Sequence, residues 1–344
     1  MRAMTRGLAT SIFAVALTVC GVFTAHAVVA ATPSSPAKAS AKKSTAAPAK
    51  APAKKSRKST TSRTASGKPE VRSSSLLVVN EDDSSILLAK NADVAVPIAS
   101  ITKLMTALVV LDAKQSLDEE LQVTKDDRSL DRGTASRLAV GTTLSRGDLM
   151  HLALMSSENR AAHALGRNYP GGIESFLDAM NAKALALGMT HAHFADPTGL
   201  SSDNVASPAD LAKLVMAASR NPTIRSYSTD TEHEVTVLKH KVEFRNTNNL
   251  VRNKDWDIVV QKTGYTEAAG RCLVMKTVVN DHPVVIVLLN SFGKYTRVAD
   301  AARIRRWIET SHQQSAVRSA MLAPAPTKVA HHLAAADNDS ASSD

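Results

Sequence analysis

Short β-rich runs stand at both ends of the part of this chain that can fold. Two apolar runs, 74–80 and 85–90, are joined by Glu-Asp-Asp-Ser, a typical hairpin turn. Three more runs follow at 256–263, 272–279 and 283–290, and Asn-Asp-His between the last two predicts another hairpin. The segment between these groups is mostly helical by its apolar spacing. The simplest packing is one antiparallel sheet in which the first and last strands are neighbours, with a helical subdomain between them, which is an α+β fold.

The helical segments are recognised by apolar residues three and four positions apart and by their end signals. Gly188 ends one helix and Ser207 is the N-cap of the next. We expect helices at 100–111, 145–165 with a break at 156–159, 173–187, 208–219 and 297–310, and a short strand at 121–123.

Both ends of the chain differ from this central part. Arg2 and Arg6 precede an apolar run and then small residues, which predicts a cleaved secretory signal peptide at 1–30 and no lasting membrane anchor. Residues 31–69 are rich in Ala, Lys, Ser and Pro and contain no aromatic residue, so they predict a disordered basic linker. The predicted folded catalytic domain is 70–311, with its helical subdomain at about 125–220, and residues 312–344 form a predicted disordered tail.

The positive charge belongs to the N-terminal part. Residues 1–69 carry twelve Lys and Arg and no acid, so the net charge of +10 leaves −2 for the rest of the chain. A cationic arm could bind nucleic acid, but the export signal argues against that partner. The arm is then either a solvated spacer or a segment that adsorbs to anionic polymers of the cell envelope.

We expect no intramolecular disulfide in the mature chain. Cys20 lies within the signal peptide, so only Cys272 remains in the mature chain. Nothing near Cys272 in sequence supplies a base, and its apolar flanks predict a buried strand residue.

Ser100 and Lys103 open the first predicted helix. Residues three apart on a helix share a face, so the Lys103 amine can reach the Ser100 hydroxyl and accept its proton. The helix N-terminus also supplies backbone N–H groups near any oxyanion that forms. The pair alone is weak evidence, because Ser35/Lys38 and Ser40/Lys43 have the same spacing within the basic arm.

Two further motifs follow in order. Ser157 and Asn159 lie on the break between two helices, where a hydroxyl can relay a proton and an amide can hold a peptide carbonyl. Ser202-Asp203-Asn204 has the same spacing but lies in a loop. Lys262-Thr263-Gly264 ends a predicted strand; Lys262 and Thr263 suit a carboxylate, and Gly264 lets a substrate approach the backbone.

His191, His193 and Asp196 are spaced like ligands of a metal ion. A metal there would compete with a complete serine apparatus, so we expect no metal site and no cofactor.

The order of these motifs resembles that of the penicillin-binding serine peptidases and β-lactamases. Within them, the chain is most similar to the low-molecular-mass D-alanyl-D-alanine endopeptidases of the penicillin-binding protein 7 type. The similar segments are V-P-I-A-S-I-T-K-L-M-T-A, L-A-L-M-S-S-E-N-R-A-A, D-P-T-G-L-S, F-R-N-T-N and K-T-G-Y-T-E-A-A-G-R-C-L-V-M, between residues 74 and 310. The resemblance implies a five-stranded antiparallel sheet flanked by helices.

The resemblance also implies a mechanism. Ser100 attacks a D-alanyl peptide carbonyl, and Lys103, its pKa lowered by burial and by the charge of Lys262, takes the proton. The backbone N–H groups of Ser100 and Tyr265 form the oxyanion hole, and Ser157 passes a proton to the leaving amine. Asn159 holds the substrate amide, and Lys262, Thr263 and Gly264 bind around its carboxylate.

The implied function is a periplasmic DD-endopeptidase that cuts peptidoglycan cross-links and is acylated by β-lactams. The same pocket would also serve a D-alanyl-D-alanine carboxypeptidase. A non-hydrolytic β-lactam sensor, a β-lactamase and a binding protein that uses the basic arm are further alternatives. A β-lactamase needs a carboxylate base for deacylation, and Glu158 leaves that possibility open.

Overall fold

The computed structural model describes residues 67–128 and 136–322. The predicted signal peptide, the linker up to residue 66 and the tail beyond residue 322 lie outside these residues.

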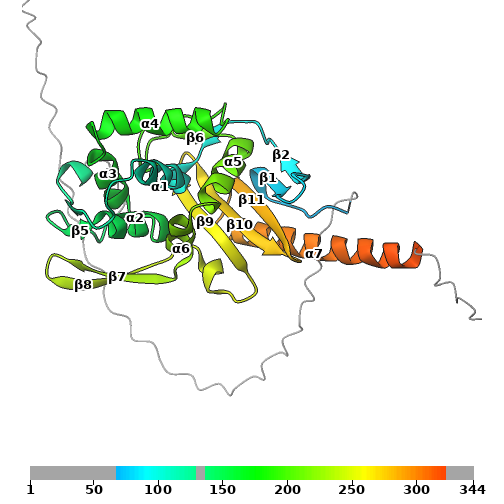
Figure 1. Ribbon diagram of the computed structural model, residues 1–344. Coiled ribbons are helices and arrows are strands. Elements are labelled where there is room, and N and C mark those ends of the chain that lie inside the picture. The colour runs from blue at the N-terminus through cyan, green and yellow to red at the C-terminus, as the bar shows by residue number, and fades with distance from the viewer. Residues whose placement is uncertain (1–66, 129–135, 323–344) are drawn as a thin grey trace, which may run out of the picture. The chain divides into compact units, whose positions relative to one another are not determined.

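One five-stranded antiparallel sheet forms the centre of the molecule (Figure 1), with the strand order β2-β1-β11-β10-β9. Its strands are β1 (Ser73–Asn80), β2 (Ile86–Lys90), β9 (Asp257–Thr266), β10 (Gly270–Val279) and β11 (His282–Ser291). The first strand pairs with the last, from Ser73 opposite Ser291 to Asn80 opposite Val284, so the predicted arrangement is confirmed. The β10–β11 hairpin is confirmed too: Asn280 and Asp281 both have positive φ, as a tight two-residue turn requires.

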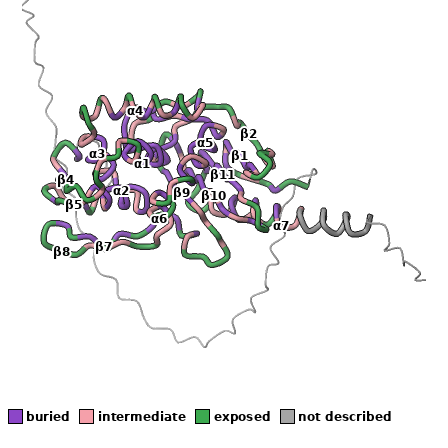
Figure 2. Tube along the Cα trace, viewed as in Figure 1, coloured by how far each residue is buried: buried purple, intermediate pink, exposed green. Residues whose placement is uncertain are grey.

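Helices cover both faces of the sheet (Figure 1). Leu77 and Val79 of β1 face the main helical layer, whereas Leu76 and Val78 face the C-terminal helix. Both faces are therefore buried, which explains why this strand is an unbroken apolar run and not an alternating one. The buried residues lie along the contact between sheet and helices (Figure 2).

The helices are α1 (Lys103–Asp112), α2 (Arg146–Met155), α3 (Asn159–Arg167), α4 (Gly172–Ala186), α5 (Pro208–Ser219), α6 (Pro222–Thr229) and α7 (Thr296–Leu322). Short 3-10 turns occur at Ala99–Thr102, Asp126–Arg128 and Asn249–Arg252. Ser207 caps α5 in a reciprocal capping box with Asp210, and Gly188 takes positive φ just after α4, so both predicted end signals are confirmed.

The remaining strands form three small antiparallel pairs. These are β3 (Val96–Pro97) with β6 (Val205–Ala206), β4 (Glu120–Gln122) with β5 (Thr143–Ser145), and β7 (Glu232–Val237) with β8 (His240–Arg245). The β7–β8 hairpin and α6 were not among the expected elements.

The closing helix is longer than predicted. Helix α7 continues to Leu322, so residues 312–322 are helical and the prediction of a disordered tail from residue 312 was wrong for this segment. The segment contains Gln, Ala, Arg, Met and Leu and no Gly or Pro, and this composition favours a helix.

Cys272 lies fully buried in β10, as predicted. Burial raises the pKa of its thiol to about 11, which makes it a poor nucleophile. Within the part of the chain that the structure describes, no helix combines the length and apolar character needed to cross a membrane.

Candidate active site

Ser100 lies in a 3-10 turn, Ala99–Thr102, that leads directly into α1. The predicted helix therefore exists, but its first turn is tighter than an α-helix. Ile101 and Leu104 are fully buried and fix the turn in the core, while Ser100 stays half-buried. The Thr102 hydroxyl donates to the Ala99 carbonyl at 2.8 Å and closes the turn. Ser100 is thus held rigidly at the surface of the core.

Lys103 is fully buried beside Ser100. Its Nζ lies 2.9 Å from Ser100 Oγ, 2.8 Å from Asn159 Oδ1 and 2.6 Å from the Thr198 carbonyl. Burial lowers the pKa of Lys103 to about 7, although the negative charges of Asp196 and Glu158 oppose the shift. A neutral amine is therefore available near pH 7.

The loop that presents the Thr198 carbonyl is built around Asp196. The buried Asp196 carboxylate accepts hydrogen bonds from the backbone N–H groups of Thr198 at 2.5 Å, Gly199 at 2.7 Å and Ser201 at 2.7 Å. Gly199 has a φ of +82° and packs so closely on the Ala99 carbonyl that a Cβ would overlap it. The loop is consequently locked against the turn that carries Ser100.

Asn204, in the second copy of the serine-x-asparagine spacing, supports the same loop. Its side-chain Nδ2 donates to Thr102 Oγ1 at 3.0 Å and to the Asp196 carbonyl at 2.9 Å. Its Oδ1 accepts from the backbone N–H groups of Ala195 and Asp196. This copy therefore has a structural role.

The residues considered as metal ligands have other contacts. The Asp196 carboxylate accepts the backbone hydrogen bonds of its own loop. His191 Nδ1 lies 3.9 Å from Asp210 Oδ2, and the backbone of His193 pairs with that of Val205. Among residues 67–128 and 136–322, no group of three His, Cys, Asp or Glu is placed to hold a metal ion.

Ser157 lies on the predicted turn between α2 and α3, and Asn159 is the first residue of α3. Ser157 has a φ of +63°, which is strained for a residue with a side chain. Its neighbour Glu158 is buried, donates its N–H to the Leu152 carbonyl at 3.1 Å and accepts a hydrogen bond from Ser136. The anchored turn brings the Asn159 side chain to Lys103.

Lys262, Thr263 and Gly264 lie inside β9 and not at its end, because β10 pairs with β9 as far as Thr266. The predicted strand end was therefore wrong. Strand β9 packs against the Ser100 turn: a Cβ on Gly264 would lie 2.9 Å from the Ile98 carbonyl and 3.2 Å from the Ser100 backbone N. Only glycine permits this approach.

Lys262 is fully buried, and its Nζ donates to the Thr263 carbonyl at 3.0 Å. Burial lowers the pKa of Lys262 well below its usual range, and the positive charges of Lys103 and Arg297 lower it further. A substrate carboxylate beside Lys262 would favour its charged form.

Tyr265 directly follows Gly264 and is exposed. Its backbone N–H belongs to the same edge strand, whereas its ring contacts the Arg271 guanidinium across the sheet.

Three polar groups in contact with the candidate site were not predicted from the sequence. Arg297, on the first turn of α7, donates to the Gly264 carbonyl at 3.2 Å. The Thr247 hydroxyl lies 2.6 Å from that of Thr263, and Thr198 contributes the carbonyl described above. Thr198 and Thr247 lie within the segments D-P-T-G-L-S and F-R-N-T-N, and the resemblance of these segments to the family could have pointed to both residues. No sequence motif marks Arg297.

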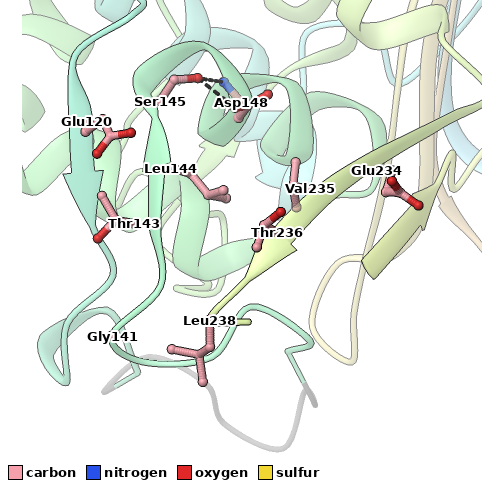
Figure 3. A pocket seen from close by; sticks show the side chains of 10 residues that line it. All are labelled: Glu120, Gly141, Thr143, Leu144, Ser145, Asp148, Glu234, Val235, Thr236 and Leu238. Carbon is pink, nitrogen blue, oxygen red and sulfur yellow. Dashed lines mark hydrogen bonds between the residues drawn. The ribbon is translucent and has the colours of Figure 1, made fainter. Parts of the chain in front are cut away.

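A separate pocket of about 490 Å³ lies away from these residues, between the β4–β5 pair, α2 and β7 (Figure 3). It is lined by Glu120, Gly141, Thr143, Leu144, Ser145, Asp148, Glu234, Val235, Thr236 and Leu238. Asp148 is already paired with His233 at 2.8 Å and Glu234 with Lys241 at 2.7 Å. This pocket contains none of the predicted site residues.

The sequence is similar to those of known D-alanyl-D-alanine peptidases. The sequence pattern of the D-alanyl-D-alanine carboxypeptidase family, peptidase S11, matches residues 61–293. A D-alanyl-D-alanine endopeptidase of Pseudomonas aeruginosa is 51% identical over 243 residues, which cover 70% of this chain and 78% of that relative. A D-alanyl-D-alanine endopeptidase of Escherichia coli is 47% identical over 253 residues, which cover 73% of this chain and 82% of that relative.

Among solved structures, the Streptomyces K15 DD-transpeptidase is similar with a TM-score of 0.65 and 27% sequence identity, over 70% of this chain and 98% of that one. The predicted α+β fold and the resemblance to penicillin-binding serine peptidases are thereby confirmed. The chain belongs to the peptidase S11 family, the family of the D-alanyl-D-alanine carboxypeptidases.

Proposed function

We propose that this protein is a serine DD-endopeptidase that hydrolyses D-alanyl cross-links between peptidoglycan stem peptides. The observation that carries the proposal is the position of the Lys103 amine between Ser100, Asn159 and Thr198. The names of the Pseudomonas and Escherichia relatives support an endopeptidase.

The surroundings of Lys103 favour its action as a general base. A neutral amine has two N–H donors and one lone pair. Asn159 Oδ1 and the Thr198 carbonyl can only accept, so they use both donors. The lone pair then faces the Ser100 hydroxyl at 2.9 Å, in position to take its proton.

Ser100 Oγ then forms a bond to the D-alanyl carbonyl carbon. The developing oxyanion is stabilised by the backbone N–H groups of Ser100 and Tyr265, which Gly264 allows to lie close together. The C–N bond breaks, and the proton held by Lys103 reaches the leaving amine through Ser157. Water then hydrolyses the ester by the same route in reverse and frees Ser100.

The other residues hold the substrate. Asn159 positions the amide of the acyl part, while Lys262, Thr263 and Arg297 surround the carboxylate beside the scissile bond. Arg297 adds a second cationic group to this site and is held there by its hydrogen bond to the Gly264 carbonyl. That carboxylate occurs both on a terminal D-alanine and on the D-centre of a cross-linking diaminopimelate, so a D-alanyl-D-alanine carboxypeptidase is the second candidate.

The chain layout fits secretion across the inner membrane to the periplasm. Residues 1–30 serve as signal peptide, the basic segment 31–69 as a linker that adsorbs to anionic envelope polymers, and residues 70–311 as the catalytic domain. β-Lactams acylate Ser100 because they present a strained amide and a carboxylate to the same groups.

Digestion of purified, cross-linked sacculi tests the proposal. We expect the protein to convert dimeric muropeptides into monomers, which chromatography of the released muropeptides measures. Removal of only the terminal D-alanine would assign the carboxypeptidase activity instead. A stable penicillin adduct with neither activity would assign a β-lactam sensor.

The pKa of Lys103 gives a further prediction. Because the neutral amine is the active form and its pKa is about 7, acylation should be fastest above pH 7. Below that value the rate should fall about tenfold per pH unit as Lys103 becomes protonated. The rate of labelling by a fluorescent penicillin between pH 5 and 9 measures this. A rate that stays constant from pH 5 to 8 would contradict the role of Lys103 as the base.

A further inference from the structure

Three exposed aromatic side chains lie at the end of the sheet that carries the candidate active site. Tyr265 is 55% exposed, Tyr295 is 69% exposed and Phe292 is 94% exposed. Large apolar side chains that gather on a surface mark a place of contact with another molecule. The other large exposed apolar residues of the described part of the chain are aliphatic and lie on other elements: Ile86, Val94, Leu185 and Leu238.

The pleat of β9 explains the position of Tyr265. Successive side chains of a strand point to opposite faces. Gly264 faces the Ser100 turn, so Tyr265 points to the other face, which α7 covers. Arg271 is paired with Tyr265 in the neighbouring strand, and its guanidinium lies 4.5 Å from the centre of the tyrosine ring.

The strand register also relates Tyr265 to the other two aromatic residues. Arg271 is also paired with Ser291, the last residue of β11, and Phe292 follows directly. Residues 292–295 connect β11 to α7, and Lys294 Nζ lies 5.4 Å from the centre of the Tyr295 ring. Arg297 then returns to the Gly264 carbonyl. The connection therefore begins in the same row of the sheet as Tyr265, two strands away, and its far end leads through Arg297 back to the residue before Tyr265.

We call Tyr265, Phe292 and Tyr295, together with Arg271 and Lys294, the aromatic platform. We propose that the aromatic platform binds a glycan strand of peptidoglycan, on the side of the scissile bond that carries the substrate carboxylate. This inference rests on the proposed function, because it extends the same substrate beyond the catalytic groups.

The direction of the substrate supports this occupant. Arg297 donates to the Gly264 carbonyl, Tyr295 precedes Arg297 by two residues and Tyr265 follows Gly264, so a carboxylate held by Arg297 with Lys262 and Thr263 lies next to the aromatic platform. The part of the polymer beyond this carboxylate is the stem peptide and the sugar to which it is attached. Rigid aromatic rings offer a large contact area at low entropic cost, and they stack on the C–H faces of sugar rings.

The charges of the aromatic platform also suit this polymer. Arg271 and Lys294 can pair with the carboxylates of the stem peptides that hang from the glycan. Lysine is depleted from protein–protein interfaces, so Lys294 favours the anionic polymer over a protein partner. The aromatic platform thus discriminates substrate attached to the wall from free peptide.

The test compares the wild type with the double variant Phe292→Ala/Tyr295→Ala. Leu185→Ala is the matched control, since Leu185 is 73% exposed on α4, away from the sheet end. Each protein is given intact sacculi and, separately, cross-linked peptide dimers from which an amidase has removed the glycan. We expect the double variant to release monomers from sacculi about 10-fold more slowly, and to match the wild type on glycan-free dimers and in penicillin labelling.

The two substrates separate the possible results. An equal decrease in the rate of hydrolysis of sacculi and of glycan-free dimers would show that the rings bind the peptide and not the glycan, and it would overturn the inference. An unchanged rate on sacculi would overturn it as well. A wild-type protein that leaves both substrates intact would refute the proposed function instead, independently of the aromatic platform.

Discussion

Replacing Ser100 by alanine should abolish both peptide hydrolysis and covalent labelling by a fluorescent penicillin. The substitution removes the atom that forms the acyl bond, and loss of the nucleophile in a serine hydrolase can cost about 10⁶-fold in kcat. Fold and stability should be unchanged, because Ser100 is half-buried and Ile101 and Leu104 keep the turn in place. Labelling detected on gels and hydrolysis of glycan-free dimers measure the effect.

Ser202→Ala is the control for this variant. Ser202 begins the second serine-x-asparagine sequence, of which Asn204 carries the structural contacts. Its loss should leave both readouts at the wild-type level. Penicillin labelling that persists in Ser100→Ala would place the nucleophile elsewhere.

Gly199→Ala should lower the acylation rate by about 100-fold. The new Cβ would overlap the Ala99 carbonyl and lie 2.9 Å from the Ser100 backbone N. Either the Thr198 loop or the Ser100 turn must move, and displacing a catalytic group by about 1 Å can cost 10²-fold. The distance between Lys103 and the Thr198 carbonyl would change at the same time.

The matched control is Gly172→Ala. Gly172 has nearly the same φ, +80°, but a Cβ there would meet no atom within 4 Å. Both variants carry the backbone strain of about 1 kcal/mol that a side chain adds at positive φ. Only Gly199→Ala should lose acylation, and thermal unfolding measures the strain separately. An equal loss of acylation in both variants would show that strain, and not the contact with Ala99, is responsible.

The strands of the sheet could be predicted because short stretches of sequence are enough to identify each strand and turn. Continuous apolar runs such as Leu76–Val79 identify buried strands, and Asn280-Asp281 identifies the hairpin turn. Helix ends were read from Ser207 and Gly188 for the same reason. The β7–β8 hairpin was missed, because its alternation of buried and exposed residues is interrupted only by Leu238-Lys239, a weak turn signal.

The candidate site could be predicted only in part. Ser100 and Lys103 are one turn apart, so their contact follows from helical geometry. The contact between Lys103 and Thr198 joins residues 95 positions apart, and that between Arg297 and Gly264 joins residues 33 apart. The periodicity of a short stretch of sequence cannot predict contacts between residues so far apart. The low pKa of Lys103 depends on burial, which exists only after these distant segments have packed together.

Strand β11 occupies the middle of the sheet, yet it is the last strand of the sequence. Until it is present, the β1–β2 and β9–β10 pairs have no common neighbour, and each leaves an open edge. Ser73 must then find Ser291, 218 positions further along the chain. Such distant pairing makes folding slow. During synthesis the five-stranded sheet therefore stays incomplete until nearly the whole domain has been made, and a partly folded polypeptide of this kind can still pass through a narrow protein channel.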